Sequence, residues 1–383
     1  MTRHLLHVVF GSQRGGCETN AQVLITCLPW VQHRVVVLGD GGPMCEDWRQ
    51  AGASVEVLGQ DAATLRGAAR AIQRIIASER PSAAILWHGL VRLPQLIHVL
   101  NPLRIPVAVH GGNPAHSMSK TTDVKFLLLE QLYSPQGPLP TYICCSEHVA
   151  ASFDSSAYLR RFPRRVIYNG VRARTTTMHR PRALSSNDTP VIGMAARLDS
   201  IKDHATLIRA MVSVRRQLPS AILELAGDGE LRNSLEKLAR QLGVASSVRF
   251  LGEVADVYSH MTRWDLFAYA TTEREGLGNA LAEAMCYGLP CVATDIGPMR
   301  EFAGDKFAVR LAPPGCPDSL GKECVRLLFD TDQRKTMATG GNAFASKRFN
   351  PVTNALQYSR VLNLSSDSLS SAVLDVTHAT LPA

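Results

Sequence analysis

Short apolar segments recur along the chain, separated by stretches with helical periodicity, and this alternation restricts the fold more than any other feature. Within each segment the apolar residues follow one another directly, which is typical of strands that are covered on both faces. A parallel sheet with helices on both sides has this organisation, so the sequence predicts an α/β protein. In the first 150 residues the segments are LLHVVF (5–10), RVVVLG (34–39), SVEVLG (54–59), AAILW (83–87), PVAVH (106–110) and TYICCS (141–146).

The pattern stops after VIYNGV (166–171) and resumes at residue 190, which indicates two domains. Residues 172–190 are rich in Arg, Ser, Thr and Pro and lack apolar periodicity, as linkers do. A length of 383 residues also exceeds one typical domain of about 100 to 200 residues, so we predict two Rossmann-like domains with a ligand cleft between them. The second series of segments is PVIGMAA (190–196), AILELAG (221–227), SVRFLG (247–252), DLFAYA (265–270), PCVATD (290–295) and FAVRLA (307–312).

These patterns predict the boundaries of each part. A helix is expected over 203–218, where Leu207, Ile208 and Met211 share one face. The expected parts are an N-terminal domain over 1–175, a linker over 176–189, a C-terminal domain over 190–345, a final helix over 346–363 and a tail over 364–383.

Cysteine usage and hydropathy indicate the compartment. The nine cysteines include no CxxC motif, Cys144 and Cys145 are adjacent, and the odd number leaves one unpaired in any disulfide scheme. Reduced thiols packed as small hydrophobic side chains fit better. The N-terminal apolar run is shorter than a signal-peptide core of roughly 7 to 15 residues, and nothing approaches the roughly 18 apolar residues of a membrane span. We therefore expect a cytoplasmic protein.

Open α/β sheets bind ligands beyond the carboxyl ends of their strands, so the residues that follow the strands are the candidates. Gly11, Gly15 and Gly16 precede a predicted helix, where bare backbone can approach a phosphate. The sequence is not GxGxxG, and a flexible turn explains it equally well. His110 ends a strand and precedes two glycines, although a lone histidine is more often structural, and His88 competes for the same role.

The first loop of the second domain contains two cations. Arg197 and Lys202 lie five positions apart in AARLDSIKD, after the strand that opens this domain. A guanidinium can bind two phosphate oxygens while an ammonium adds a mobile point charge, so the pair can converge on one diphosphate. Surface charge is the simpler interpretation for either residue alone. Gly227 lies in the tight turn AGDGE after the next strand, a common and uninformative feature.

Residues 273–290, EREGLGNALAEAMCYGLP, contain two acids separated by seven residues. Glu275 lies in a turn after a strand, and Glu283 lies about one turn into a helix that should begin near Gly278 or Asn279. The N-terminus of a helix attracts anions, and the two carboxylates can accept hydrogen bonds from hydroxyls on both sides of that anion. A nucleotide sugar has this arrangement. As an isolated match, the pair would more simply be a turn acid and an exposed helix residue.

A basic segment accounts for much of the net charge of +8. Residues 160–182 hold eight arginines and no acid. No aromatic-rich RNA-binding signature accompanies them, so we favour attraction to an anionic membrane surface or a phosphorylated acceptor over nucleic acid. A solvated loop fits the same segment.

Taken together and in order, these motifs resemble the retaining glycosyltransferases of family four, which have the GT-B fold and an E-x7-E motif. The resemblance runs from about residue 5 to residue 360 and is most specific over 190–300. It implies two Rossmann-like domains facing across a cleft, with the last helix returning to the N-terminal domain. The motifs that carry it are RGGCE, VAVHGG, ICCSEHVAASF, VIYNGV, AARLDSIKDHATLI, LAGDGELRNSLEKLARQLGVASSVRFLG and EGLGNALAEAMCYGLPCVATDIG.

The resemblance also implies a role for each candidate residue. Arg197 and Lys202 correspond to cations that bind the donor diphosphate, Glu275 to the acid beside the transferred sugar, and Glu283 to the acid on the ribose. His110 corresponds to a histidine near the reacting centre. The catalytic candidates are His110, Arg197, Lys202 and Glu275, and the donor-binding candidates are Gly16, Arg197, Lys202, Gly227, Glu275, Gly276, Leu277, Gly278, Asn279, Glu283 and Gly297. We expect Arg197 and Glu275 to face solvent in the cleft.

The function implied is transfer of a sugar from a nucleotide sugar to a saccharide or lipid-linked acceptor, with retention of configuration, in cell-surface polysaccharide biosynthesis. UDP-sugars are the first expectation for the donor and GDP-sugars the second, and peripheral contact with the inner face of the plasma membrane would occur through residues 160–182. No cofactor or metal is expected, because DTD at 330–332 lies between helices and is better explained as a helix cap. A nucleotide-sugar epimerase with a related fold, an inactive nucleotide-sugar-binding protein and a nucleic-acid binder are the alternatives.

Overall fold

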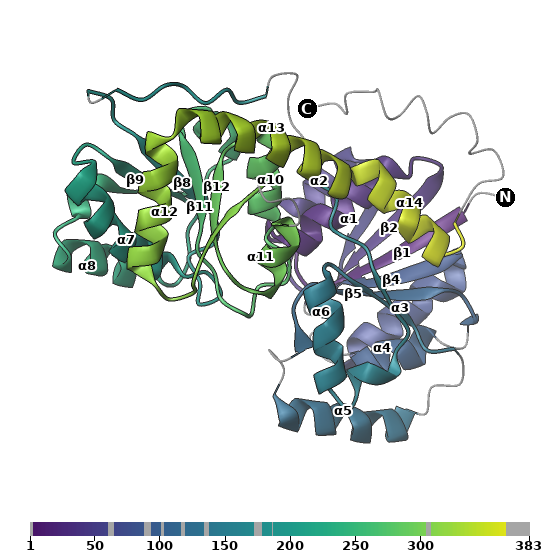
Figure 1. Ribbon diagram of the computed structural model, residues 1–383. Coiled ribbons are helices and arrows are strands. Elements are labelled where there is room, and N and C mark those ends of the chain that lie inside the picture. The colour runs from purple at the N-terminus through teal and green to yellow at the C-terminus, as the bar shows by residue number, and fades with distance from the viewer. Residues whose placement is uncertain are drawn as a thin grey trace. The chain divides into compact units, whose positions relative to one another are not determined.

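The computed structural model separates the chain into two compact units. Unit 1 comprises residues 1–170 and 350–383, and unit 2 comprises residues 171–349. Both are α/β units built on a parallel sheet, so the predicted fold class is confirmed (Figure 1). The structure describes residues 3–59, 65–87, 93–100, 103–115, 119–133, 138–171, 178–185, 187–303 and 308–364.

The sheet of unit 1 has seven parallel strands in the order β3-β2-β1-β4-β5-β6-β7. All six segments expected in this part of the chain form strands. β7 was not expected, because this three-residue strand at the sheet edge contains two arginines and so lacks the apolar run that predicts a strand. The bounds are β1 (Arg3–Val9), β2 (Val31–Val37), β3 (Ser54–Val57), β4 (Ala83–Trp87), β5 (Val107–Gly111), β6 (Thr141–Cys144) and β7 (Arg164–Val166).

Helices cover this sheet, and the central strands are almost wholly buried. Every residue of β4 is buried, as expected for a strand with helices on both faces. The helices are α1 (Gly16–Cys27), α2 (Met44–Gln50), α3 (Leu65–Glu79), α4 (Leu93–Leu100), α5 (Lys120–Tyr133), α6 (Glu147–Ser152) and α14 (Pro351–Val361), with short 3-10 turns at Phe153–Ser155 and Leu159–Arg161.

The last of these helices, α14, belongs to unit 1 although it follows all of unit 2 in the sequence. Asn350 caps it by accepting a hydrogen bond from the Thr353 N–H at 2.9 Å, and Pro351 occupies its first turn. α14 packs against α1 (Figure 1). Its buried side chains, among them Ala355 and Tyr358, are part of the unit 1 core. The expected return of the final helix to the N-terminal domain is therefore confirmed.

The sheet of unit 2 has six strands in the order β10-β9-β8-β11-β12-β13, and its paired strands are parallel. The strand order reverses between β8 and β11, and in such sheets the crevice beyond the carboxyl ends of the two strands at the reversal is the usual ligand site. The six expected segments correspond to β8 (Val191–Ala195), β9 (Ile222–Ala226), β10 (Val248–Gly252), β11 (Leu266–Tyr269), β12 (Cys291–Thr294) and β13 (Arg310–Ala312).

The helices of unit 2 begin where the sequence supplies caps. The helix expected over 203–218 is α7 (His204–Gln217), and the Asp203 side chain accepts a hydrogen bond from the Thr206 N–H at 3.1 Å. Asp330 of the DTD sequence likewise caps α13 and accepts from the Gln333 N–H at 2.8 Å, so its expected role as a helix cap is confirmed. The other helices are α8 (Arg232–Gln241), α9 (Val257–Met261), α10 (Asn279–Tyr287), α11 (Gly297–Phe302), α12 (Pro317–Phe329) and α13 (Thr331–Arg348), with a 3-10 turn at Ala245–Ser247.

Part of the segment expected as a linker is bound to unit 2. The guanidinium of Arg182 makes two hydrogen bonds to the carboxylate of Asp265, at 2.8 and 3.1 Å, and a third to Asp188 at 2.8 Å. The His179 N–H donates to the Tyr287 carbonyl at 2.8 Å. Residues 178–185 and 187–190 therefore pack as part of unit 2, whereas residues 172–177 and residue 186 lie outside the described part of the chain.

The thiols and the helices agree with the compositional analysis. None of the nine cysteines, all of which the structure describes, forms a disulfide, and eight of them are buried, as expected for reduced thiols that pack as small hydrophobic side chains. Among the helices that the structure describes, none combines the length and hydropathy needed to cross a bilayer.

Candidate functional site

The loop after β8 is shaped by a carboxylate that binds backbone. Asp199 Oδ1 accepts hydrogen bonds from the N–H groups of Ile201 and Lys202, at 3.0 and 3.3 Å. Such a turn folds the loop back on itself. Gly227, which directly follows the next strand, lets that strand's end pack closely against this loop. A Cβ at this position would lie 2.1 Å from the Ala196 carbonyl oxygen, so a larger residue would not fit. The sequence prediction included Gly227 without this reason.

Backbone hydrogen bonds join this loop to the segment after β11. The Asp203 N–H donates to the Ala270 carbonyl and the Thr272 N–H to the Ile201 carbonyl, both at 3.0 Å. Lys202 and Thr271 form an isolated antiparallel bridge. Residues separated by about 70 positions in the sequence are thereby held together at the carboxyl ends of β8 and β11, where the strand order reverses.

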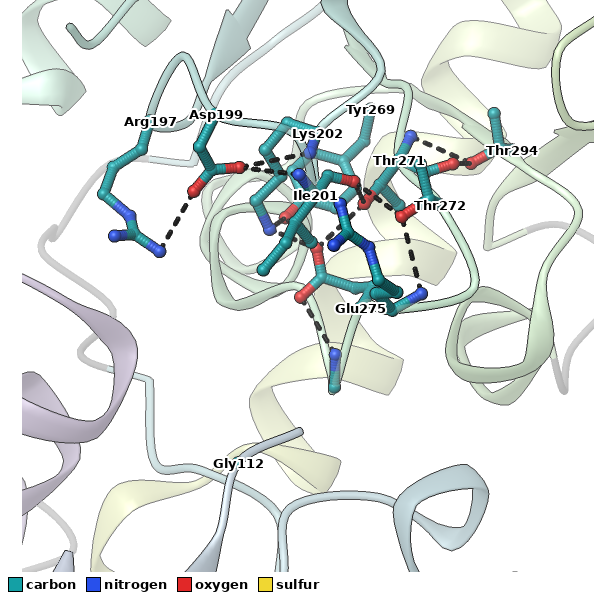
Figure 2. A network of polar contacts seen from close by, with 12 residues as sticks. Gly112, Arg197, Asp199, Ile201, Lys202, Tyr269, Thr271, Thr272, Glu275 and Thr294 are labelled. Carbon is teal, nitrogen blue, oxygen red and sulfur yellow. Dashed lines mark hydrogen bonds and ion pairs between the residues drawn. The ribbon is translucent and has the colours of Figure 1, made fainter. Parts of the chain in front are cut away.

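Four groups converge on the Glu275 carboxylate (Figure 2). The Lys202 ammonium pairs with Oε2, the Tyr269 hydroxyl donates to the same oxygen at 2.9 Å, and Thr271 Oγ1 lies 3.1 Å from it. The Gly276 N–H donates to Oε1 at 3.2 Å. Lys202 also donates to the Tyr269 hydroxyl at 2.7 Å. The structure therefore brings two of the predicted catalytic residues into direct contact.

Burial and charge act in opposite directions on Glu275. Its side chain is 10% exposed and that of Lys202 is 14% exposed. Burial alone would raise the pKa of Glu275, but the Lys202 ammonium and the hydrogen bonds from Lys202, Tyr269 and Thr271 outweigh it, so the pKa is lowered. Glu275 is an ionised carboxylate at neutral pH. The expectation that it faces solvent was wrong, because Lys202, Tyr269 and Thr271 pack around the carboxylate.

Arg197 lies on the same loop, and its side chain is 69% exposed. Its guanidinium pairs with Asp199 Oδ2 at 3.1 Å (Figure 2). Arg197 therefore faces solvent as expected, and it is separate from the cluster around Glu275.

The helix after the Glu275 turn begins as predicted. α10 starts at Asn279, and Gly278 before it has a φ of 92°. This conformation favours glycine, and a Cβ would lie 2.8 Å from Met299 Cε. Leu277 is buried at 2% exposure and fixes the turn against the unit 2 core. These residues orient the first turn of α10 beside Glu275.

Glu283 lies on α10, one turn into the helix. Its side chain is half-buried, and burial raises its pKa to about 7. The carboxyl group is therefore close to half-ionised at neutral pH, in contrast to Glu275. Gly297 begins α11 after β12, at the same carboxyl edge of the sheet.

The remaining candidates belong to unit 1. Gly16 is the first residue of α1, at the carboxyl end of β1. His110 lies on β5, is 2% exposed, and its Nδ1 is 2.9 Å from the Tyr358 hydroxyl of α14. His88 lies outside the described residues.

The sequence analysis missed several residues that build these sites. Asp199 was detectable, because an Asp two to three positions before the N–H groups it binds is a common turn signal. Tyr269 and Thr271 carried no comparable signal, because their side chains follow an ordinary buried strand. Tyr358 is 248 positions from its partner and only folding brings the two together.

In fold, the chain is an α/β protein with two Rossmann-like units, and it superposes on solved structures titled as glycosyltransferases. The structure titled Anabaena Alr3699/HepE in complex with UDP and glucose superposes with a TM-score of 0.79, covering 94% of this chain and 99% of that chain at 23% identity. At 23% identity, this similarity shows a shared fold and nothing more.

Sequence comparison shows what the chain is similar to. Residues 176–343, less than half of the chain, match the model of glycosyl transferases group 1. The lipopolysaccharide core biosynthesis glycosyltransferase LpsE of Rhizobium meliloti (strain 1021) is 30% identical over 44% of this chain and 48% of its own length. A GDP-mannose-dependent α-(1-6)-phosphatidylinositol monomannoside mannosyltransferase of Mycobacterium tuberculosis (strain ATCC 25618 / H37Rv) is 29% identical over 42% of this chain and 44% of its own length. The matched part thus spans less than half of these curated relatives.

Proposed function

We propose that the chain is a glycosyltransferase that moves a sugar from a nucleotide sugar to a saccharide or lipid-linked acceptor, with retention of configuration. One observation carries the proposal. Lys202 and Glu275 meet at the point where the strand order of unit 2 reverses, beside the start of α10, within the segment that matches the glycosyltransferase family. The shared fold of solved glycosyltransferases supports it.

In the proposed reaction, the bond between the sugar anomeric carbon and the diphosphate oxygen breaks, and the acceptor oxygen forms a new bond to that carbon. The proton of the acceptor hydroxyl passes to the departing diphosphate oxygen. The departing nucleoside diphosphate keeps the electron pair, so negative charge grows on it in the transition state. The cations Arg197 and Lys202 and the N–H groups at the start of α10 can stabilise this charge. We propose that they do so without a metal ion.

In this proposal Glu275 does not act as a nucleophile. Its carboxylate already accepts several hydrogen bonds, and these keep it ionised and fixed. A carboxylate of this kind suits hydrogen bonding to sugar hydroxyls and stabilisation of positive charge at the anomeric carbon. The ammonium of Lys202 contacts this carboxylate, and we propose that it also contacts the diphosphate.

For the donor, we propose a UDP-sugar first and a GDP-sugar second. Support for UDP comes from the bound UDP named for the HepE structure, and support for GDP from the GDP-mannose dependence named for the mycobacterial relative. Neither name identifies the nucleobase of the donor that this chain uses. Because Glu283 is proposed to bind the ribose, which both nucleotides share, it does not discriminate between them.

We further propose that the acceptor belongs to cell-surface polysaccharide or glycolipid synthesis and is met at the inner face of the plasma membrane. Within the basic segment, Arg164 pairs with Asp154 at 2.5 Å and Arg182 pairs with Asp265, whereas Arg160 and Arg165 are exposed. Exposed arginines are attracted to anionic lipid. Sedimentation with phosphatidylserine vesicles should exceed sedimentation with phosphatidylcholine vesicles and fall with salt. Equal sedimentation with both would contradict the membrane part of the proposal.

The donor is tested by thermal denaturation in the presence of UDP, GDP, ADP, dTDP and CMP, each with magnesium and with EDTA. A ligand that binds only the native state raises its stability by mass action. A selective increase in melting temperature that EDTA does not remove would support a metal-independent transferase and identify the base. Absence of any increase would contradict nucleotide binding, and an increase only with magnesium would contradict the metal-free mechanism.

A further inference from the structure

A buried chain of polar groups links the returning helix to the candidate histidine of unit 1. Tyr358 of α14 is 0% exposed, and His110 of β5 and Asn20 of α1 are each 2% exposed. The Tyr358 hydroxyl lies 2.9 Å from His110 Nδ1 and accepts a hydrogen bond from Asn20 Nδ2 at 3.1 Å. The Gly170 N–H donates to Asn20 Oδ1 at 3.2 Å.

The hydrogen bond from the Gly170 N–H to Asn20 determines which group donates in each of the other hydrogen bonds of this chain. A backbone N–H can only donate, so the Asn20 atom that faces Gly170 must be the carbonyl oxygen. The amide nitrogen of Asn20 then faces Tyr358 and donates to its oxygen. A phenol has one proton, and His110 Nδ1 is the remaining partner for it. Tyr358 therefore donates to Nδ1, which must be unprotonated.

The surroundings favour the same protonation state. Burial raises the pKa of Tyr358 well above its usual value, although the hydrogen bond from Asn20 opposes the shift, so the phenol keeps the proton that it donates. The Trp87 ring packs on the His110 imidazole with 4.9 Å between ring centroids. An imidazolium at 2% exposure, packed on an indole and facing a donating hydroxyl, would lose its hydration.

We infer that Tyr358 and Asn20 are positioning residues that hold His110 as a neutral imidazole with its proton on Nε2, so that His110 serves as a hydrogen-bond donor and not as a base. The inference rests on the proposed function and on the position near the reacting centre that the family resemblance implies for His110. With the proton on Nε2 and Nδ1 occupied by Tyr358, the ring has no nitrogen that can take a proton from an acceptor hydroxyl. It can donate Nε2–H to an oxygen of the bound sugar.

The tautomer is tested directly by long-range ¹H–¹⁵N NMR of protein labelled on histidine, with His110→Gln used to assign the His110 signals. At neutral pH, wild type should give an Nε2-protonated ring. Asn20→Asp is the decisive variant, because a carboxylate cannot donate. Tyr358 would then donate to Asp, and Nδ1–H of His110 would donate to Tyr358, so the tautomer should reverse. A wild-type ring protonated on Nδ1 or on both nitrogens would overturn the inference, and so would an unchanged tautomer in Asn20→Asp.

Activity provides a second test, with a control on the same helix. Tyr358→Phe removes the hydroxyl that contacts His110, whereas Asn354→Ala removes a hydrogen bond to the Tyr168 carbonyl at 2.9 Å and leaves His110 alone. We expect Tyr358→Phe to lower kcat by roughly ten-fold to a hundred-fold with little change in the donor KM, and Asn354→Ala to leave kcat near that of wild type. Equal kcat losses in the two variants would indicate a purely structural role for Tyr358.

The two proposals can fail separately. If wild type transfers no sugar from any nucleotide sugar, the proposed function fails, and the NMR result still decides whether Tyr358 and Asn20 set the tautomer. If wild type is active and Tyr358→Phe is as active as Asn354→Ala, the positioning role fails while the proposed function stands. Melting temperatures of both variants establish that they fold.

Discussion

At the scale of single residues, the ion pair between Lys202 and Glu275 combines a structural and a proposed catalytic role. Each partner is mostly buried, and each would be left with an uncompensated charge if the other were removed. Arg197, on the same loop, is exposed and pairs only with Asp199 among the ion pairs that the described residues form. Substitution at the two cations should therefore have different effects on stability.

Lys202→Met keeps the aliphatic stem and removes the charge. We expect the free energy of unfolding to fall by about 1 to 3 kcal/mol, because ionised Glu275 loses its counter-charge. Sugar transfer should fall with it. Chemical denaturation of Lys202→Met and of the double variant Lys202→Met/Glu275→Gln provides the check. The double variant should recover stability without recovering transfer, and a single variant as stable as wild type would contradict the assigned role of the pair.

Arg197→Met should leave the free energy of unfolding within about 0.5 kcal/mol of wild type, because the side chain is 69% exposed. If the guanidinium binds the donor diphosphate, kcat/KM for the nucleotide sugar should fall by roughly ten-fold or more. Steady-state kinetics beside a denaturation curve separates the two effects. Normal kinetics in this variant would remove Arg197 from the donor site.

Glu283 should make nucleotide binding depend on pH. Its pKa of about 7 means that the carboxyl group ionises as the pH rises through neutrality, and an ionised carboxylate binds ribose hydroxyls more strongly than a protonated one. We expect UDP affinity to rise by about five-fold between pH 6 and pH 8, beyond the effect of diphosphate ionisation. Calorimetry on Glu283→Gln, which carries no charge at either pH, supplies the reference. Parallel pH dependences in the two proteins would argue against a ribose contact.

At the scale of elements, three neighbouring strands of unit 1 are joined by a second buried polar chain. Trp87 of β4 donates to His7 Nδ1 of β1 at 3.2 Å, His7 Nε2 lies 3.0 Å from His33 Nδ1 of β2, and His33 Nε2 lies 3.1 Å from the Leu28 carbonyl. An indole N–H only donates, so His7 and His33 must both be neutral and protonated on Nε2. Protonation of either histidine would break this chain of hydrogen bonds, so acid should destabilise this part of the sheet.

We expect the stability of unit 1 to fall as the pH drops from about 6.5 toward 4. Burial lowers the pKa of His33 to about 4, despite its hydrogen bond to Leu28, and burial followed by repulsion from His33 lowers that of His7. The unfolded chain takes up protons near pH 6.5 and the folded chain does not, so acid favours unfolding. His33 alone would account for up to roughly 3 kcal/mol at pH 4. Denaturation curves between pH 8 and pH 5 measure the loss, and a stability that does not change over this range would contradict the assigned neutral state.

The sequence predicted the elements better than their contacts. The twelve apolar segments became strands because unbroken apolar runs bounded by turn residues have few other stable conformations in a covered sheet. β7 was missed because Arg164 and Arg165 at a sheet edge resemble a loop. The start of α10 could be predicted from Gly278. In contrast, the basic composition of residues 160–182 gave no sign that Arg182 would pair with Asp265.

The candidate site shows the same division. Lys202 and Glu275 were named from their positions after strands, but their contact depends on the Asp199 turn and on strand pairing far apart in the sequence. Burial of Glu275 could not be predicted, because it results from Tyr269 and Thr271 closing around the carboxylate. Local patterns identify which residues follow a strand, and tertiary structure decides which of them meet.

At the scale of the whole molecule, unit 2 is continuous in the sequence and has its own core. We expect a fragment consisting of residues 171–349 to fold alone and to bind the same nucleoside diphosphate as the full chain, because the contacts around Lys202 and Glu275 all lie within it. Circular dichroism and calorimetry on the fragment are the measurements. A cooperative melt with bound nucleotide is the expected result, and an unfolded fragment would mean that unit 2 depends on unit 1.

Unit 1 is built differently, because α14 supplies part of its core from beyond unit 2. During synthesis on the ribosome, the first 170 residues emerge and then wait while about 180 more are translated, which takes about ten to forty seconds at roughly 5 to 20 residues per second. Throughout that interval the surface of α1 that packs against α14 has no partner, and unit 2 is complete before α14 is made. The nascent chain therefore completes its second unit before its first, and the exposed face of α1 is the part that a chaperone would have to protect.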